Sequence, residues 1–329
     1  MPPDIIKHYP VMLNEVLSYL EDNKVICDCT FGGGGYSSKI LEKFTTSSVI
    51  GIDRDSNILD HASNLKKKYF NRFNFFNIKF SQINKIKNLN DVDYFLFDLG
   101  LSNFQLKNLD RGFSFQSPKK LDMTMGLNTL NAYDLIQNVS EKDLTSILKF
   151  FGEEKFAYKI SKGIVKYRLK KKISSGDELS NIINGIKFKR SRINPSTKSF
   201  QAIRMIVNQE LSEIYIALKH IIENCKLGAV IVIVTFHSLE DILVKRVFNY
   251  YGKKKSLSRY IPVKKERENI SIDILTKKAC KPSEIEIKRN PNSRSAKLRV
   301  IKKVKNPNII LNREDLNMEK YFYLEELYA

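Results

Sequence analysis

The fold is decided by the stretch Val25-Ile26-Cys27-Asp28-Cys29-Thr30-Phe31-Gly32-Gly33-Gly34-Gly35. Its first five residues are mostly apolar and β-forming, which is typical of a short buried strand. The four glycines predict a turn in which the backbone can approach a ligand that a side chain would block. Residues 37–44 then have a helical pattern. A strand, an open turn and a helix in this order indicate the first unit of a parallel α/β sheet.

The same alternation continues through the first hundred residues. Strands are expected at residues 48–53, 73–80 and 93–98, and a helix is expected between the first two of these and ends near Lys68. Alternation of this kind predicts a doubly wound, Rossmann-like sheet of the α/β class.

The alternation stops near residue 105. Residues 105–199 are rich in lysine and in helix formers, and they contain no convincing buried strand. A helix is expected over 200–223, and the very apolar strand 229–235 follows it. Because a core strand returns after a helical detour, we predict that a mostly helical domain is inserted into the sheet domain.

The predicted organisation has three parts. The sheet domain comprises residues 1–104 and 200–305, the inserted helical domain for substrate recognition comprises 105–199, and a C-terminal tail comprises 306–329. Within the second part of the sheet domain we expect a helix over 241–250, a charged loop over 253–268 and a last strand over 296–304.

Two acids lie at strand ends, where parallel sheets bind ligands. Asp53 ends the second strand, and its carboxylate can accept hydrogen bonds from both ribose hydroxyls of an adenosine group. A dinucleotide site favours G-x-G-x-x-G, but counted from Gly32 this pattern has Ser37 at its last position. S-adenosylmethionine has no pyrophosphate and needs only an open turn, so the sequence favours this cofactor over a nicotinamide dinucleotide.

The fourth strand ends in Asp98-Leu99-Gly100-Leu101-Ser102-Asn103. In enzymes that methylate amines, the target nitrogen meets the methyl donor at this strand end. The exocyclic amine of cytosine is a poor nucleophile because its lone pair is delocalised into the ring. Acceptors on its N–H groups localise electron density on nitrogen and stabilise the charge that develops there. Asp98 is therefore the candidate catalytic residue.

The charge of the chain is segregated. The net charge is +20, and residues 149–198 and 245–303 carry +10 and +14, so the rest of the chain is slightly acidic. Basic regions of this size are typical of proteins that bind the phosphates of nucleic acids. An A+T-rich coding sequence would also raise the lysine content, but it would not leave the remainder acidic.

Other site classes lack support in the sequence. The four cysteines do not form a disulfide framework, and Cys27 and Cys29 read as buried thiols. The four histidines show no zinc-ligand spacing with them, so no metal site is predicted. We find no run of about 18 apolar residues and no secretory signal, and we therefore expect a cytoplasmic protein that does not bind membranes.

Several motifs together resemble one known family. They are His8-Tyr9-Pro10-Val11-Met12-Leu13, Asp28 to Gly35, Asp98 to Ser102, Arg111-Gly112-Phe113-Ser114-Phe115, Leu121-Asp122-Met123, Phe200-Gln201-Ala202-Ile203-Arg204, Phe236-His237-Ser238-Leu239-Glu240-Asp241 and Ser293-Arg294-Ser295-Ala296-Lys297-Leu298-Arg299. The series resembles the bacterial 16S rRNA (cytosine-N4)-methyltransferases, which use S-adenosylmethionine to modify a decoding-centre cytosine. It runs in order over nearly the whole chain.

The resemblance implies a function in rRNA processing and a set of site residues. The partner would be 16S rRNA in the small ribosomal subunit, and the oligomeric state is left open, a homodimer included. The implied cofactor contacts are Gly34, Gly35, Tyr36, Asp53, Phe80, Asp98 and Gln105. The candidate substrate contacts are Ser102, Arg111, Phe113, His237, Ser238 and Arg294.

Five of the six candidate substrate contacts have a structural alternative. His237 and Ser238 follow the most apolar strand, where either residue could cap the next helix. Arg111 and Phe113 could clamp an extruded base, but aromatic residues at alternate positions are more often core. Arg294 could meet phosphate, or it could simply be solvated.

The sequence departs from the family pattern at six positions. Tyr36 stands where histidine is usual, and Asn103-Phe104 replaces Ser-Pro. Thr124, Lys198 and Asn292 stand where arginine is common. None of these changes removes Asp53 or Asp98, so we expect activity to persist. The alternatives to be tested are a methyltransferase of the same fold that acts on DNA or a small molecule, and a non-catalytic RNA-binding protein.

Overall fold

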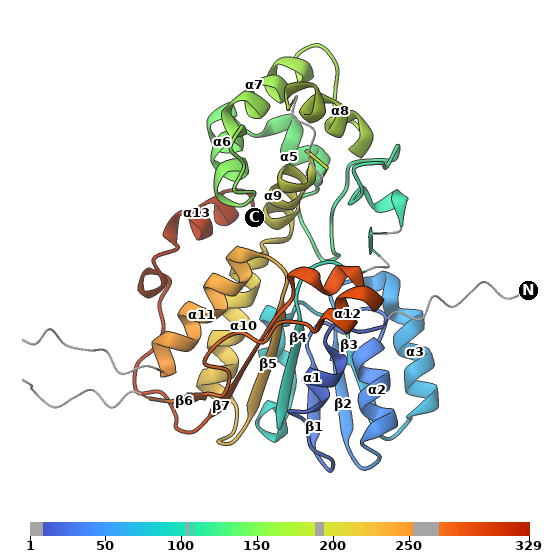
Figure 1. Ribbon diagram of the computed structural model, residues 1–329, viewed down its shortest axis with the longest axis vertical. Coiled ribbons are helices and arrows are strands. Elements are labelled where there is room, and N and C mark those ends of the chain that lie inside the picture. Colours follow the sequence, from blue (N-terminus) through green and yellow to red (C-terminus); the bar gives the residue numbers. More distant parts are fainter. Residues whose placement is uncertain (1–8, 103–104, 107, 188–193, 253–269) are drawn as a thin grey trace, which may run out of the picture. The chain divides into compact units, whose positions relative to one another are not determined.

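The computed structural model describes residues 9–102, 105–106, 108–187, 194–252 and 270–329 (Figure 1). The predicted charged loop at 253–268 and the departures Asn103 and Phe104 lie outside these residues. The chain divides into two compact units. The first unit contains Met1–Gly100 and Glu213–Leu316, and the second contains Leu101–Ser212 and Asn317–Ala329.

The first unit is built on a seven-stranded sheet with the order β3-β2-β1-β4-β5-β7-β6. The strands are β1 (Val25–Asp28), β2 (Ser48–Ile52), β3 (Phe73–Phe76), β4 (Tyr94–Asp98), β5 (Val230–Thr235), β6 (Ile272–Ile274) and β7 (Lys297–Lys303). The first five strands are parallel, and β7 runs antiparallel to both β5 and β6. The predicted α/β class and doubly wound sheet are confirmed. The sequence did not indicate β6, because three residues are too few to show a pattern.

Helices connect the strands of the first unit (Figure 1). The α-helices are α1 (Leu13–Leu17), α2 (Gly35–Lys43), α3 (Leu59–Lys68), α10 (Glu210–Asn224), α11 (Ser238–Gly252) and α12 (Glu284–Arg289). The first turn of α10, up to Ser212, belongs to the second unit. The 3₁₀ helices are η1 (Ser56–Ile58), η2 (Phe80–Lys85), η3 (Leu89–Asp91), η5 (Pro291–Ser295) and η6 (Glu314–Leu316).

The sheet is buried on both faces, as parallel sheets are. On one face, Ile26 of β1 and Leu96 of β4 join a core with Ile40 of α2. The alternate residues of β4 and β5 point to the other face, and Phe95 and Ile231 are also fully buried there. The near-continuous apolar strands in the sequence follow from this burial.

The strand order reverses between β1 and β4. From β1 the chain adds strands in one direction, to β2 and β3, and from β4 it adds β5 in the other. Cys27 pairs with Phe95 and Asp28 pairs with Leu96 across this junction. Helical connections therefore diverge at the carboxyl ends of β1 and β4, which leaves the crevice where such folds bind ligands.

The second unit is helical. It contains α5 (Ala132–Asn138), α6 (Glu141–Phe150), α7 (Ala157–Arg168), α8 (Gly176–Ile186), α9 (Thr197–Asn208), α13 (Glu319–Leu327) and the 3₁₀ helix η4 (Leu109–Arg111). The prediction of a single helix over 200–223 is wrong. This segment is divided into α9 and α10 at Gln209, whose φ of 52° lies in the left-handed region and stops the first helix.

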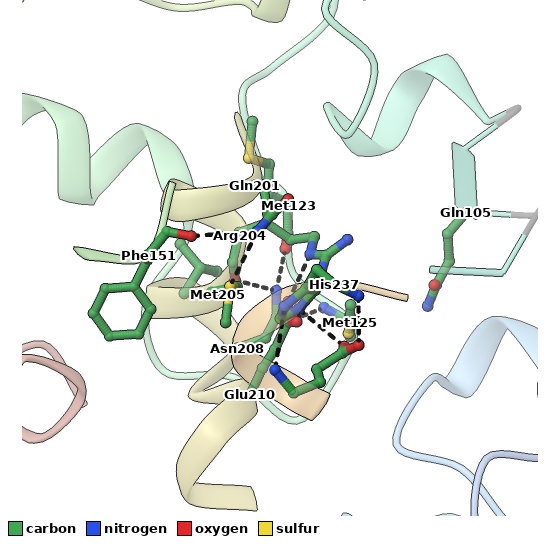
Figure 2. Close-up of polar contacts among 12 residues, drawn as sticks. Gln105, Met123, Met125, Phe151, Gln201, Arg204, Met205, Asn208, Glu210 and His237 are labelled. Atoms are coloured by element: carbon green, nitrogen blue, oxygen red, sulfur yellow. Dashed lines mark hydrogen bonds and ion pairs between the residues drawn. The ribbon is translucent and has the colours of Figure 1, made fainter. Parts of the chain in front are cut away.

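A polar network on α9 joins two sequence motifs of the second unit (Figure 2). The amide of Asn208 donates to the Met123 carbonyl over 2.8 Å, and its oxygen accepts from the Met125 backbone N–H over 2.8 Å. Arg204 makes a two-pronged contact with Glu210, in which Nε lies 2.6 Å from Oε1. These contacts give the polar residues after Phe200 a structural role.

A buried carboxyl group holds the last helix of the second unit. Glu325 of α13 accepts hydrogen bonds from the backbone N–H groups of Leu211 and Ser212, over 2.9 and 2.8 Å, and from the Ser212 hydroxyl. These amides belong to the first turn of α10, which has no helical partners for them. Burial raises the pKa of Glu325 to about 8, against the lowering effect of its three hydrogen bonds.

None of the helices in the described residues combines the length and the apolar character that a membrane crossing requires.

We predict that Glu325→Ala destabilises the second unit by about 2–4 kcal/mol, because two backbone amides and one hydroxyl lose their acceptor in a buried place. Native-state hydrogen exchange of the α9 and α10 amides measures the change. Tyr323→Ala on the exposed side of the same helix is the matched control, with an expected change below about 0.5 kcal/mol. Equal exchange in the two variants would show that Glu325 does not hold the helix.

Candidate functional site

The glycine turn after β1 has an open surface. Gly32 and Gly34 have φ values of 52° and 75°, in the left-handed region that favours glycine. Gly34 is the N-cap of α2, and a Cβ atom there would lie 2.8 Å from the ring of Phe31. A Cβ at Gly33 would meet no atom within 4 Å. The turn is therefore closed on its protein side and open on the other, as a ligand-binding backbone requires.

Asp53 is tied to this turn. One carboxylate oxygen accepts the Gly32 backbone N–H over 2.7 Å, and the other accepts the Asp55 backbone N–H over 2.9 Å. Burial raises the pKa of Asp53 to about 6, although these two hydrogen bonds lower it. Each carboxylate oxygen has a second lone pair, so the fixed carboxyl group retains the capacity to accept ribose hydroxyls.

Asp28 is a second acid at the edge of the sheet, and the sequence analysis did not select it. Its side chain is fully buried at the end of β1. It accepts a hydrogen bond from the Ser37 hydroxyl over 2.6 Å and a weaker one from the Thr30 N–H over 3.4 Å. Burial raises the pKa of Asp28 to about 6. The signal was present, because Asp28 ends its strand as Asp98 does.

Asp98 ends β4, next to β1. Its backbone N–H donates to the Thr30 hydroxyl over 2.7 Å, which fixes the strand end against the glycine turn. Its Oδ1 is buried and has no hydrogen-bond partner among the residues that the structure describes. Burial, together with the charges of Asp28 and Glu240, raises the pKa of Asp98 well above its usual range.

When ionised, these acids give the site a negative charge. Asp28 and Asp53 also act on each other, since the charge of Asp53 raises the pKa of Asp28. Buried carboxyl groups are costly, and groups with shifted pKa values are concentrated at functional sites. A positively charged ligand would compensate their charge, and an amine donor would satisfy Oδ1 of Asp98, which none of the described residues contacts by a hydrogen bond.

The first unit also holds the predicted aromatic contacts. The Tyr36 hydroxyl, near the start of α2, donates a hydrogen bond to the Val11 carbonyl, and the ring is buried. Any cofactor contact of Tyr36 would therefore use its backbone. Phe80 begins η2 and is half-buried, with its ring edge-on to Phe97 of β4 at 5.7 Å between centroids. An adenine group could lie against such a ring.

His237 and Glu240 form the start of α11. His237 precedes the helix, and its Nδ1 accepts the Glu240 backbone N–H over 3.3 Å, while Glu240 accepts the His237 backbone N–H over 3.3 Å. This is a reciprocal capping box. The alternative of a capping histidine is thus realised, and the cap lies one residue before Ser238. Glu240 was missed by the sequence analysis, although its spacing from His237 is the capping signal.

Four predicted contacts belong to the second unit. Ser102 and Gln105 bond each other reciprocally, with the Ser102 N–H 3.1 Å from the Gln105 side chain and the Gln105 N–H 3.2 Å from the Ser102 hydroxyl. Arg111 donates to the Thr124 carbonyl over 2.7 Å and lies 5.6 Å from the centre of the Phe113 ring. Arg111 and Phe113 are both buried, which agrees with the core alternative.

The last predicted contact and the remaining departures lie at the surface. Arg294 on η5 is exposed, as is Asn292. Lys198 donates to the Glu153 carbonyl over 3.0 Å. Lys297, three residues after Arg294, forms an ion pair of 2.9 Å with Asp241.

The residues present fit S-adenosylmethionine. Gly33 and Gly34 offer the open turn, Asp53 offers a fixed acceptor at the second strand, and Asp98 offers an unused acceptor beside them. The acids have the opposite charge to a sulfonium. The roles of the individual residues stay predictions.

The chain is similar to known proteins over nearly its whole length. The sequence profile of the MraW methylase family matches residues 5–304. The chain is 40% identical to ribosomal RNA small subunit methyltransferase H of Sulfurihydrogenibium sp. over 309 residues, which cover 91% of the chain and all of the relative. It is 41% identical to the protein of the same name from Rickettsia canadensis, over 90% of the chain and 98% of the relative.

Solved structures are more distant. An rRNA methylase from Streptococcus thermophilus aligns with a TM-score of 0.39 and 8% identity, over 89% of the chain and 94% of that protein. TrmN from Thermus thermophilus aligns with a TM-score of 0.41 and 9% identity, over 89% of the chain and 48% of that protein.

The raised pKa of Asp28 predicts how stability depends on pH. A carboxyl group with a pKa of about 6 in the folded protein, against 3.8 when exposed, holds its proton more tightly when folded. Its contribution to the free energy of unfolding is therefore largest below pH 4 and is lost as the pH rises through 6. We expect a loss of about 1–3 kcal/mol from this group over that window.

Asp28→Asn should remove this part of the pH dependence, because an amide does not ionise and Ser37 can either donate to it or accept from it. Urea denaturation between pH 4.5 and 7.5 measures the change, with the exposed Asp273→Asn as control. An unchanged pH profile in Asp28→Asn would mean that Asp28 is not the titrating group.

Proposed function

The chain belongs to the MraW methylase family and is an S-adenosylmethionine-dependent methyltransferase, and we propose that it methylates the exocyclic N4 amine of a cytosine in the decoding centre of 16S rRNA. The observation that carries this proposal is the buried Oδ1 of Asp98 at the end of β4, which has no hydrogen-bond partner in the described part of the chain. The named relatives act on small-subunit rRNA, and the basic charge of this chain suits the same substrate. The protein would then meet its substrate in the cytoplasm.

The proposed roles follow the geometry of the first unit. Asp53 would hold the ribose of the cofactor, and the turn from Gly32 to Gly35 would face its methionine end. When bound, S-adenosylmethionine supplies a methyl group on a positively charged sulfur, which needs no further activation. The task left to the protein is to align the amine with that methyl group.

Asp98 would act on the target amine. Its Oδ1 can accept an N–H of the exocyclic amine, which localises the nitrogen lone pair and stabilises the positive charge that forms there. A carboxylate with a raised pKa is also a stronger base, so Asp98 is suited to receive the proton that the methylated nitrogen releases. Burial beside Asp28 and Glu240 is the cause of that basicity.

The remaining parts would bind RNA. We propose that the second unit and the basic C-terminal part of the first unit hold the RNA backbone, which positions the substrate without reading its sequence. A cytosine within a structured ribosomal centre has to leave its stack to reach a buried acid. Exposed Arg294 is a candidate phosphate contact.

Substrate class is tested by offering labelled cofactor with unmethylated small ribosomal subunits, DNA or free cytidine. We expect methyl transfer to the subunits alone, and mapping of modified cytosines in rRNA from cells with and without the protein should locate one position. Transfer to DNA or to cytidine at the same rate would overturn the proposed substrate. Calorimetric titration with S-adenosylmethionine tests the alternative of a protein without catalysis, which predicts no binding.

We predict that Asp98→Ala lowers kcat for methyl transfer by about 100-fold or more. The target amine then loses both its hydrogen-bond acceptor and the base that takes its proton. Asp98→Asn keeps the acceptor oxygen but cannot take the proton, so its kcat should lie between those of Asp98→Ala and the wild type. Single-turnover assays at saturating cofactor measure these rates.

Asp53→Ala provides the contrast. It should raise the Kd for S-adenosylmethionine by about 10- to 100-fold through the lost hydrogen bonds, while kcat at saturation changes little. Full methylation by folded Asp98→Ala would remove Asp98 from the mechanism without affecting the assignment of Asp53.

A further inference from the structure

One face of α7 in the second unit carries a line of lysines. Lys155 precedes the helix, Lys159, Lys162 and Lys166 lie within it, and Lys170 follows it, and all five are exposed. Their spacing of three or four residues places them on one side of an α-helix. We call these five residues and Tyr158 the α7 lysine face.

The opposite side of α7 is its core side. Ala157, Ile160 and Ile164 are buried within the second unit, so the helix cannot turn its lysines inward. The one arginine of the helix is used structurally, because Arg168 donates to the Ile136 and Val139 carbonyls. The lysines therefore form an outward surface on a fixed helix.

Among the described residues, the α7 lysine face has no acidic partner. The helix itself contains no aspartate or glutamate, and none of the five lysines of the face forms an ion pair with a described residue. Helices that are merely solvated usually mix both signs, as α6 does with Glu141, Lys142 and Asp143. Like charges three and four residues apart destabilise a helix. A line of unpaired lysines on α7 is thus costly for stability, which indicates an anionic partner.

An exposed aromatic ring lies beside the lysines. The side chain of Tyr158 is 59% exposed, and the Lys162 ammonium lies 5.9 Å from its ring centre. A base can stack on such a ring, while lysines beside it contact the phosphates on either side. An acidic protein would match the charge but would gain nothing specific from the flat ring.

We propose that the α7 lysine face binds RNA, with the lysines on consecutive phosphates and Tyr158 stacked on an unpaired base of the small-subunit rRNA. This inference rests on the proposed function, because it assigns a surface to the same substrate. The lysines supply affinity that depends on salt, and Tyr158 selects a segment whose bases are free to stack. This surface would position the RNA for the site in the first unit without touching the reacting atoms.

The test separates the charge from the ring. In the charge variant, Lys159, Lys162 and Lys166 are each replaced by Ala. Its control replaces Lys43, Lys67 and Lys87 by Ala; these lysines are also exposed and lie in the first unit towards the edge where the parallel strands begin. Tyr158→Ala removes the ring, and Tyr158→Phe restores it. Binding to unmethylated small subunits and to protein-free 16S rRNA is measured between 50 and 200 mM KCl, with kcat and KM for the subunits.

The charge variant should bind both RNAs at least about tenfold more weakly at 50 mM KCl, and the slope of log affinity against log salt should fall by about 2 to 3. KM should rise in parallel, with kcat and the Kd for S-adenosylmethionine within about threefold of the wild type. Tyr158→Ala should weaken binding by about 5- to 100-fold without changing the slope, and Tyr158→Phe should bind as the wild type does.

Three outcomes overturn the proposal. Equal losses in the charge variant and the Lys43/Lys67/Lys87 control would show an effect of total charge. A loss confined to subunits and absent from protein-free rRNA would assign the face to a ribosomal protein. Wild-type affinity and slope in the charge variant would exclude this face while leaving methylation intact. If the wild-type enzyme binds rRNA but methylates only DNA or cytidine, the proposed function fails and the binding data still decide the role of α7.

Discussion

The burial of carboxyl groups at the ends of β1, β2 and β4 is the constraint on which the candidate site depends. Asp28, Asp53 and Asp98 all have raised pKa values, and burial is the main cause each time. The fold tolerates this cost because backbone amides and two hydroxyls fix the surrounding turn. A site prepared in this way has no need to reorganise when a cation arrives.

The strand order explains why these acids meet. Since β1 and β4 are neighbours and their connections diverge, the residues after both strands lie along one crevice. The hydrogen bond from the Asp98 N–H to the Thr30 hydroxyl fixes one side of it. Chain segments nearly seventy residues apart thus share a single short edge.

Much of this arrangement could be predicted from the sequence, because alternating apolar runs with acids at their ends follow directly from a parallel sheet. Asp53 and Asp98 were found by that rule, and Asp28 obeys it too. Other features depend on tertiary contacts. The break at Gln209 has no proline or glycine to announce it, and β6 exists only because β7 offers it a partner. The inward hydrogen bond of Tyr36 likewise required the position of Val11. The domain boundaries and the roles of single residues stay predictions.

The contact of Glu325 with the start of α10 has a consequence for how the protein is made. The acceptor lies 114 residues after Leu211 in the chain, and synthesis runs from the N-terminus. Helices α5 to α9 therefore emerge from the ribosome well before the residue that satisfies the first amides of α10. Synthesis of the second unit therefore begins before that of β5 to β7, and its last helix, α13, is made only after all the strands of the sheet.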